Sequence, residues 1–398
     1  MSPGADRLAR RRILAGCGAS DAAADELLAY AESGFAPDAL AADREIPLDD
    51  EPFVDAWERY AARARSVGAV AALREGLVQL RFPVVEGMSE RAEYQAATRR
   101  GALPEEGAFE PAQFDDEAGI RIVLHETPAG RLPVVTARAR ADFERLIHAL
   151  TRRNEPQPLP ASMGACIVAG YNDWGRIAAR REAWAARCAR AGEAGDDVAW
   201  QAELREVLAQ RELYQDRFVI LSTGPYSGTP ASDLGLQHDE WVALSHVIRL
   251  EHECAHYFTR RAFGSMKNSL LDELIADYTG IVAARGRFEP EWLVRFMGVE
   301  GDDFRPAGRL RNYRGTPPLS DEAFVVLQEL VRRAAQTLDG LDVLLRGGEA
   351  PRTMPRTPGE VARAITAIAA TGLEHLAVPG AAGTVYARYR DAGALAIA

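Results

Sequence analysis

The longest helix that the hydrophobic pattern predicts covers residues 239–261. This segment contains neither proline nor glycine. Its apolar residues recur at helical spacing, at Trp241, Val242, Leu244, Val247, Ile248, Leu250 and Tyr257. Asp239 can cap the N-terminus of this helix, and Gly264 is expected to end it. A turn over residues 262–268 should follow.

A second helix is expected directly after that turn. Ser269 can cap it, with Asp272 completing an S-x-x-D capping pattern. Gly280 lies inside the predicted helix and weakens it, because glycine is a poor helix former. The pattern gives Asp272 a capping role and nothing more, worth about 1 kcal/mol.

Short apolar runs and alternating patterns predict strands in the first part of the chain. Residues 119–126 and 132–137 flank a turn at Pro128-Ala129-Gly130, and this arrangement predicts a hairpin. Further strands are expected at 77–85, 163–171 and 217–222. The small, turn-forming residues of 224–235 then make a long loop, and a loop of that length is usually functional or mobile.

Helical patterns occur on both sides of this loop. The remaining predicted helices cover residues 8–15, 22–31, 54–75, 139–152, 174–191, 197–215, 290–296, 320–338, 343–346 and 360–376. Strands and helices are mixed before the loop, whereas helices dominate after it. We therefore predict an α+β protein with two parts: a mixed part containing a small sheet at 1–235, and a mainly helical part at 236–398.

Composition narrows the class of protein. A net charge of −11 and a pI near 5.3 argue against a nucleic-acid partner or an anionic membrane surface. Four scattered cysteines, with no C-x-x-C pair, favour a reduced cytoplasmic protein over a disulfide scaffold. The apolar run before Cys17 is too short for a secretion signal, so we expect no export. Composition leaves the oligomeric state open.

The strongest chemical motif lies within the predicted 239–261 helix. His252-Glu253-Cys254-Ala255-His256 is an H-E-x-x-H pentapeptide. Residues four apart on a helix lie about 40° apart around its axis, so His252 and His256 can bind one metal ion. Glu253 lies about 100° from His252, beside the ion, where a general base for water belongs.

The second helix supplies carboxylates at the same spacing. Glu273 and Asp277 are four residues apart, so they share one helix face. A zinc site with two histidines usually takes a carboxylate as its third protein ligand and leaves the fourth position to water. Glu273 suits that place. Asp277 suits an outer role, accepting the second N–H of a ligand histidine and so fixing its tautomer.

Together HECAH and DELIADYTG resemble the gluzincin branch of zinc metallopeptidases, over roughly 40 of the 398 residues. The gap between the two motifs is slightly shorter than in well-known members. The metzincin pattern is excluded, because its glycine and third histidine would fall on Thr259 and Ala262. The resemblance implies a zincin-like, Zn²⁺-dependent hydrolase that cleaves amide or peptide bonds with metal-activated water, Glu253 acting as base. It also implies an edge strand for an extended substrate, at 163–171 or 217–222.

Two other classes of function remain open. The same metal could serve a hydrolase or lyase acting on a small molecule in a biosynthetic pathway. Alternatively, a structural zinc could hold two helices together without any catalysis. If the protein is the amide-cleaving zinc hydrolase that the resemblance implies, a peptide or another small amide is the expected substrate.

A hydrolase also needs a group that stabilises a developing oxyanion or binds substrate. His246 falls near Glu253 on the helical wheel, and Arg249 lies on the side of the histidines. His375 and Tyr386 occur late in the chain, where thermolysin-like enzymes place such donors. We take these four as candidates.

Overall fold

The computed structural model describes residues 3–32, 35, 45–105, 107–193, 195–264, 270–301, 304–306, 308–352 and 354–393. The chain has the predicted α+β class, with many helices and one small mixed sheet. It forms two compact units. We call Asp49–Glu126 with Gly130–Thr223 the sheet unit, and Met1–Leu48, Thr127–Ala129 and Gly224–Ala398 the helical unit. The expected division at residue 235 differs from this one, because both the loop 224–235 and the first 48 residues belong to the helical unit.

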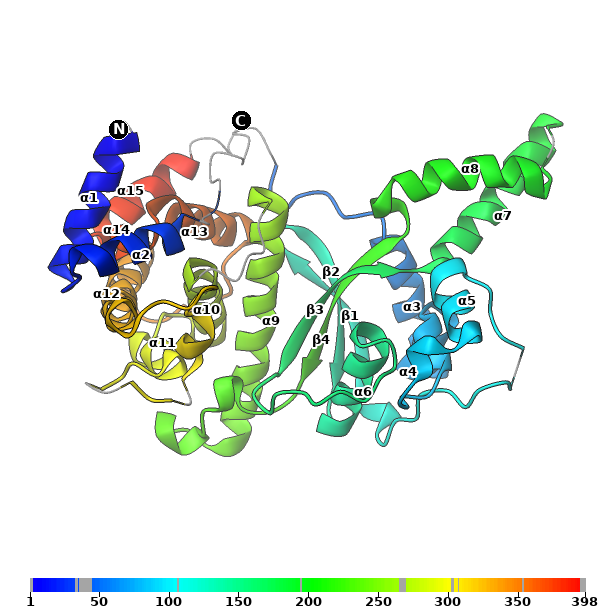
Figure 1. The fold of residues 1–398 in the computed structure, drawn as a ribbon, viewed down its shortest axis with the longest axis horizontal. Helices are drawn as coiled ribbons and strands as arrows, with labels where there is room; N and C mark the ends of the chain where they lie inside the picture. The colour runs from blue at the N-terminus through cyan, green and yellow to red at the C-terminus, as the bar shows by residue number, and fades with distance from the viewer. Residues whose placement is uncertain are drawn as a thin grey trace. The chain divides into compact units, whose positions relative to one another are not determined.

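The sheet unit is built on four strands (Figure 1). Their order in the sheet is β1-β2-β4-β3. The strands are β1 (Ile120–Thr127), β2 (Gly130–Ala137), β3 (Ala165–Asn172) and β4 (Gln215–Ser222). β2 pairs with β4 in parallel, and β3 pairs with β4 antiparallel. Because β4 is paired on both sides, residues 217–222 have no edge to offer a substrate, and that alternative is wrong. β3 is an edge strand of this sheet.

The apolar faces of the sheet unit pack against α3 (Val54–Val67), α4 (Ala69–Gly76) and α6 (Arg140–Thr151). Gly68, with a φ of 88°, divides the helix predicted at 54–75 into α3 and α4. The strand predicted at 77–85 is wrong: Val78–Arg81 form a 3₁₀ helix, with Leu80 and Phe82 buried. A short apolar run signals burial, and burial alone does not separate a strand from a turn of helix. The unit is completed by α5 (Ala92–Arg100), α7 (Trp174–Ala191) and α8 (Asp197–Ala209).

The helical unit contains α1 (Pro3–Gly16), α2 (Asp21–Ala31), α9 (His238–Phe263), α10 (Leu270–Arg285), α11 (Pro290–Met297), α12 (Asp321–Leu345), α13 (Pro358–Thr371), α14 (Leu373–Leu376) and α15 (Ala382–Gly393). The first two helices lie against the C-terminal ones (Figure 1): α1 contacts α14, and α2 contacts α12. The helices predicted at 320–338 and 343–346 form one helix, and Gly372 divides the one predicted at 360–376. No helix of the described residues is long and apolar enough to cross a membrane.

α9 starts at His238, so Gln237 occupies the cap position and Asp239 lies in the first turn. Gly264, with a φ of 72°, ends the helix as predicted. Residues 262 and 263 belong to α9 rather than to a turn, whereas 265–268 and the expected cap Ser269 lie outside the described residues.

Gly280 lets α10 approach α9 closely. A Cβ atom at this position would lie 2.5 Å from the backbone oxygen of Ile248 and 3.1 Å from its Cγ2. Since Ile248 is one turn before His252, this approach sets how the two motif-bearing helices face each other. The glycine is therefore a requirement of packing as well as a weak point of the helix.

We expect Gly280→Ala to destabilise the protein. Overpacking typically costs about 1–3 kcal/mol, whereas replacing a helical glycine by alanine returns only about 1 kcal/mol. Urea unfolding would measure the change. Gly359→Ala is the matched control, because it also adds a methyl group to a helical glycine but meets nothing within 4 Å. Equal stability of the two variants would contradict the packing role.

Candidate metal centre

α9 and α10 bring His252, His256 and Glu273 together. Their ligand atoms all lie within 4.8 Å of one another. The two Nε2 atoms are 3.1 Å apart, and each lies 3.5 Å from a carboxylate oxygen of Glu273. The three residues are buried, with 6%, 8% and 4% of their surfaces exposed. The proposed ligand set thus meets at one buried point.

The outer nitrogen of His256 contacts Asp272. His256 Nδ1 lies 2.9 Å from Asp272 Oδ2, and the Thr259 hydroxyl donates to Asp272 Oδ1 at 3.0 Å. Asp272 is 2% exposed. The sequence predicts only a capping role for this residue, whose expected partner Ser269 lies outside the described residues; in the structure its carboxylate also contacts a predicted ligand histidine.

The outer nitrogen of His252 has two partners. Its Nδ1 lies 3.0 Å from Asp277 Oδ1, the contact that the sequence analysis expects. It also lies 2.9 Å from the Tyr226 hydroxyl, which donates to Asp277 Oδ1 at 2.7 Å. Arg309 donates to the other Asp277 oxygen and, at 3.1 Å, to the Tyr226 hydroxyl. Asp277 is completely buried.

Neither Tyr226 nor Arg309 is predicted from the sequence as a site residue. Tyr226 belongs to the loop 224–235, whose length was the available signal. The loop is fixed to α9: Ser245 Oγ accepts from the Tyr226 N–H at 2.9 Å, and Trp241 Nε1 donates to the Thr229 carbonyl at 2.7 Å. Arg309 starts a short 3₁₀ helix, Arg309–Tyr313, in a stretch with no recognisable motif.

The hydrogen bonds determine what the cluster can bind. With a metal bound, both imidazoles would be neutral, and each would give its Nδ1–H to a carboxylate and turn its Nε2 lone pair toward the common point, where Glu273 adds a further lone pair. The carboxylates of Asp272, Glu273 and Asp277 surround this point, and the guanidinium of Arg309 offsets one negative charge. A divalent cation would balance the two excess negative charges. Two imidazoles and one carboxylate also suit zinc.

The pKa shifts of Glu273, Asp277 and His256 also indicate that the site favours positive charge. In the metal-free site, burial would raise the pKa of Glu273, but a hydrogen bond from His256 and the positive charge of the two histidines hold it well below its usual value. Burial likewise opposes ionisation of Asp277, yet the Arg309 charge lowers its pKa. Burial would lower the pKa of His256, whereas Asp272 raises it well above the usual value. The cluster holds its carboxylates ionised and attracts cations.

Glu253 is placed differently from the ligands. Its side chain is half-buried on α9, beside His252. Within the described part of the chain, its carboxylate has no hydrogen-bond or ion-pair partner. It is therefore available to a water molecule or a substrate, as a general base must be.

The four candidates for substrate or oxyanion binding are placed unequally. Arg249 is buried and donates to the carbonyls of Gly224 and Pro225 at 3.3 and 3.2 Å, so it holds the loop. His246 is half-buried on α9, two turns before Glu253.

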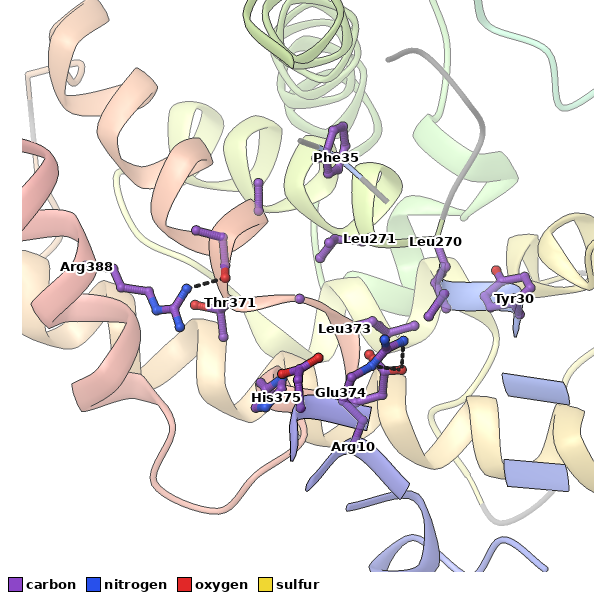
Figure 2. A pocket seen from close by; sticks show the side chains of 15 residues that line it. Arg10, Tyr30, Phe35, Leu270, Leu271, Thr371, Leu373, Glu374, His375 and Arg388 are labelled. Carbon is purple, nitrogen blue, oxygen red and sulfur yellow. Dashed lines mark hydrogen bonds and ion pairs between the residues drawn. The ribbon is translucent and has the colours of Figure 1, made fainter. Parts of the chain in front are cut away.

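His375 and Tyr386 lie at other features of the helical unit. His375 lines a cavity of about 460 Å³, and the three proposed ligands are not among its lining residues (Figure 2). Arg10 and Glu374 form a hydrogen-bonded ion pair at this cavity, with N–O distances of 3.0 and 2.7 Å. Tyr386 stacks on Tyr389 of the same helix, with ring centroids 6.4 Å apart.

Asp272→Asn should weaken metal binding by about 10- to 100-fold, the usual loss when the partner of a ligand histidine is changed. The asparagine amide has the volume of the Asp272 carboxylate, but it is uncharged and has only one oxygen. It therefore cannot accept hydrogen bonds from both His256 and Thr259. Competition with a chelating dye would measure the affinity. Asp321→Ala removes an exposed carboxylate from the first turn of α12 and should change nothing. Unchanged affinity in Asp272→Asn would remove the orienting role.

Fold and site define an α+β protein whose helical unit encloses a His–His–Glu cluster. The chain belongs to a family of unknown function, DUF7005, whose model matches residues 12–380 and so includes every residue of the cluster. Comparisons with curated proteins and with solved structures found no match.

Proposed function

We propose that this protein is a zinc-dependent hydrolase that cleaves amide or peptide bonds. The observation that carries the proposal is the convergence of His252, His256 and Glu273 on one buried point, with each outer histidine nitrogen held by a carboxylate. Three protein ligands are typical of catalytic zinc, whereas structural sites usually have four. Within the described residues, no fourth His, Cys, Asp or Glu joins this group.

Zinc, when bound, would act as a Lewis acid toward a carbonyl oxygen and lower the pKa of a water molecule. The protein's residues supply the rest. His252, His256 and Glu273 hold the ion, and Asp272 and Asp277 fix the orientation of the imidazoles.

Glu253 would move the protons. Its carboxylate can take a proton from the attacking water and later deliver it to the leaving nitrogen, so one residue serves as base and then as acid. The half-buried position beside His252 and the absence of a partner in the described structure support this role.

The substrate that we propose is a peptide or another small amide, hydrolysed in the cytoplasm. The four scattered cysteines, with no C-x-x-C pair, are typical of a protein from a reducing compartment. The net charge of −11 disfavours nucleic acid as the partner.

The test combines metal analysis with an unbiased substrate screen. The purified protein should contain about one zinc per chain and should cleave members of a peptide library, read by mass spectrometry. A chelator should abolish cleavage, and added zinc should restore it. A parallel set of N-acyl amino acids would detect a small-amide hydrolase. Absence of a stoichiometric transition metal would refute the proposal, and metal without cleavage in either set would favour a structural zinc.

A further inference from the structure

Tyr226 is the loop residue that reaches a proposed metal ligand. It is 5% exposed. Its hydroxyl lies 2.9 Å from His252 Nδ1, 2.7 Å from Asp277 Oδ1 and 3.1 Å from Arg309 NH1. Three chemically different groups therefore meet at one phenolic oxygen.

The bonding capacity of this oxygen is completely used. A phenol has one proton to donate and two lone pairs to accept with. Arg309 can only donate, so it occupies one lone pair. Asp277 is an ionised carboxylate that can only accept, so it takes the phenol proton. The remaining lone pair faces His252 Nδ1.

This arrangement selects one tautomer of His252. If Nδ1 carried no proton, its lone pair would face a lone pair of the phenol at 2.9 Å and the Asp277 carboxylate at 3.0 Å. Both contacts would be repulsive inside a buried site. With a proton on Nδ1, both contacts become hydrogen bonds, and the Nε2 lone pair faces Nε2 of His256 at 3.1 Å, a contact that a metal ion shared by the two nitrogens would make favourable.

We propose that Tyr226 is a positioning residue that, together with Arg309, holds His252 in the Nδ1–H tautomer with its Nε2 directed to the metal. The inference rests on the proposed metal function. Tyr226 is thus a second partner of His252 Nδ1, besides Asp277, and it connects the loop 224–235 to this proposed ligand. Through this connection, the placement of the loop sets the orientation of the imidazole.

The ring of Tyr226 packs independently of its hydroxyl. It meets the Phe296 ring edge to face at 5.1 Å, and the guanidinium groups of Arg309 and Arg249 lie 5.1 and 5.8 Å from its centre. These contacts remain in Tyr226→Phe. The variant therefore removes the hydroxyl while keeping the packing that holds the loop.

The experiment compares Tyr226→Phe with the wild-type protein in three measurements. Zinc affinity comes from competition with a chelator, the coordination geometry from the visible spectrum of the cobalt-substituted protein, and the fold from thermal unfolding of the metal-free protein. We expect zinc affinity to fall about 10- to 100-fold and the cobalt spectrum to change, at temperatures where both proteins are folded. Arg309→Lys keeps the positive charge but loses the two separate nitrogens that donate to Tyr226 and Asp277. This variant should also lower the zinc affinity and change the cobalt spectrum.

Tyr278→Phe is the matched control. Tyr278 lies on α10, is 1% exposed, and accepts from Arg356 at 2.9 Å. Like Tyr226→Phe, the Tyr278→Phe variant loses a buried hydroxyl that is bonded to an arginine, but this hydroxyl is not bonded to a proposed ligand. The zinc affinity of Tyr278→Phe should therefore stay at the wild-type value.

The outcomes separate the two proposals. Wild-type protein without any transition metal would overturn the proposed function and this inference with it. Wild-type zinc content with unchanged affinity and spectrum in Tyr226→Phe would overturn the positioning role alone. An equal loss in Tyr226→Phe and Tyr278→Phe would also overturn it, because the effect would then be general to buried hydroxyls.

Discussion

Glu253→Gln should keep its zinc and its fold while losing turnover by about 10²–10⁴-fold or more, the usual contribution of a general acid–base residue. A neutral amide of the same shape can still hydrogen-bond water but cannot accept its proton. The loss should fall on kcat rather than on KM, because substrate binding does not need the proton transfer.

The measurement needs turnover and zinc content for the same two proteins. Glu240→Gln is the control, since it makes the same change at an exposed position of α9. If Glu253→Gln retained both zinc and full turnover, the catalytic role of this residue would be wrong, and the structural-zinc alternative would take its place.

Glu273→Ala should lose nearly all bound zinc, and His252→Ala and His256→Ala should behave alike. Each change leaves two ligands of the three that meet at the buried point. The loss should exceed the 10- to 100-fold expected when an outer partner such as Asp272 is changed.

Unfolding gives an independent measure of the same loss. A metal present at about 100 times its Kd stabilises the folded state by about 2.7 kcal/mol, so zinc should raise the Tm of the wild-type protein and leave that of Glu273→Ala unchanged. Glu291→Ala, an exposed change in the first turn of α11, is the control. Stoichiometric zinc in Glu273→Ala would require a different third ligand.

The part of the site that follows from local spacing could be predicted. His252 and His256 share a face because a helix places residues four apart on one side. The helix itself could be predicted because residues 239–261 contain neither proline nor glycine. Glu273 and Asp277 follow from the same rule. None of these placements requires knowledge of how distant segments pack.

The part that depends on how elements cross could not be predicted. Whether Asp272 faces His256 depends on the angle at which α10 meets α9, and that angle depends on the close approach at Gly280. The pairing of β4 on both sides is equally non-local, so the apolar run 217–222 could not reveal that it lies inside the sheet. Arg309 reaches Asp277 from a segment whose sequence has no periodic signal.

The order of the segments in the helical unit has a consequence for biosynthesis. The Ser320 N–H donates to Glu26 of α2 across 294 positions, and Arg10 of α1 pairs with Glu374 across 364. Domains generally fold as units while the chain is being made, so we expect the sheet unit to fold first, while α1 and α2 still lack their packing partners. A premature stop codon before α12 would therefore leave α1 and α2 without α12 and α14, the helices against which they pack. A truncation near the C-terminus would thus expose apolar surface on the N-terminal helices.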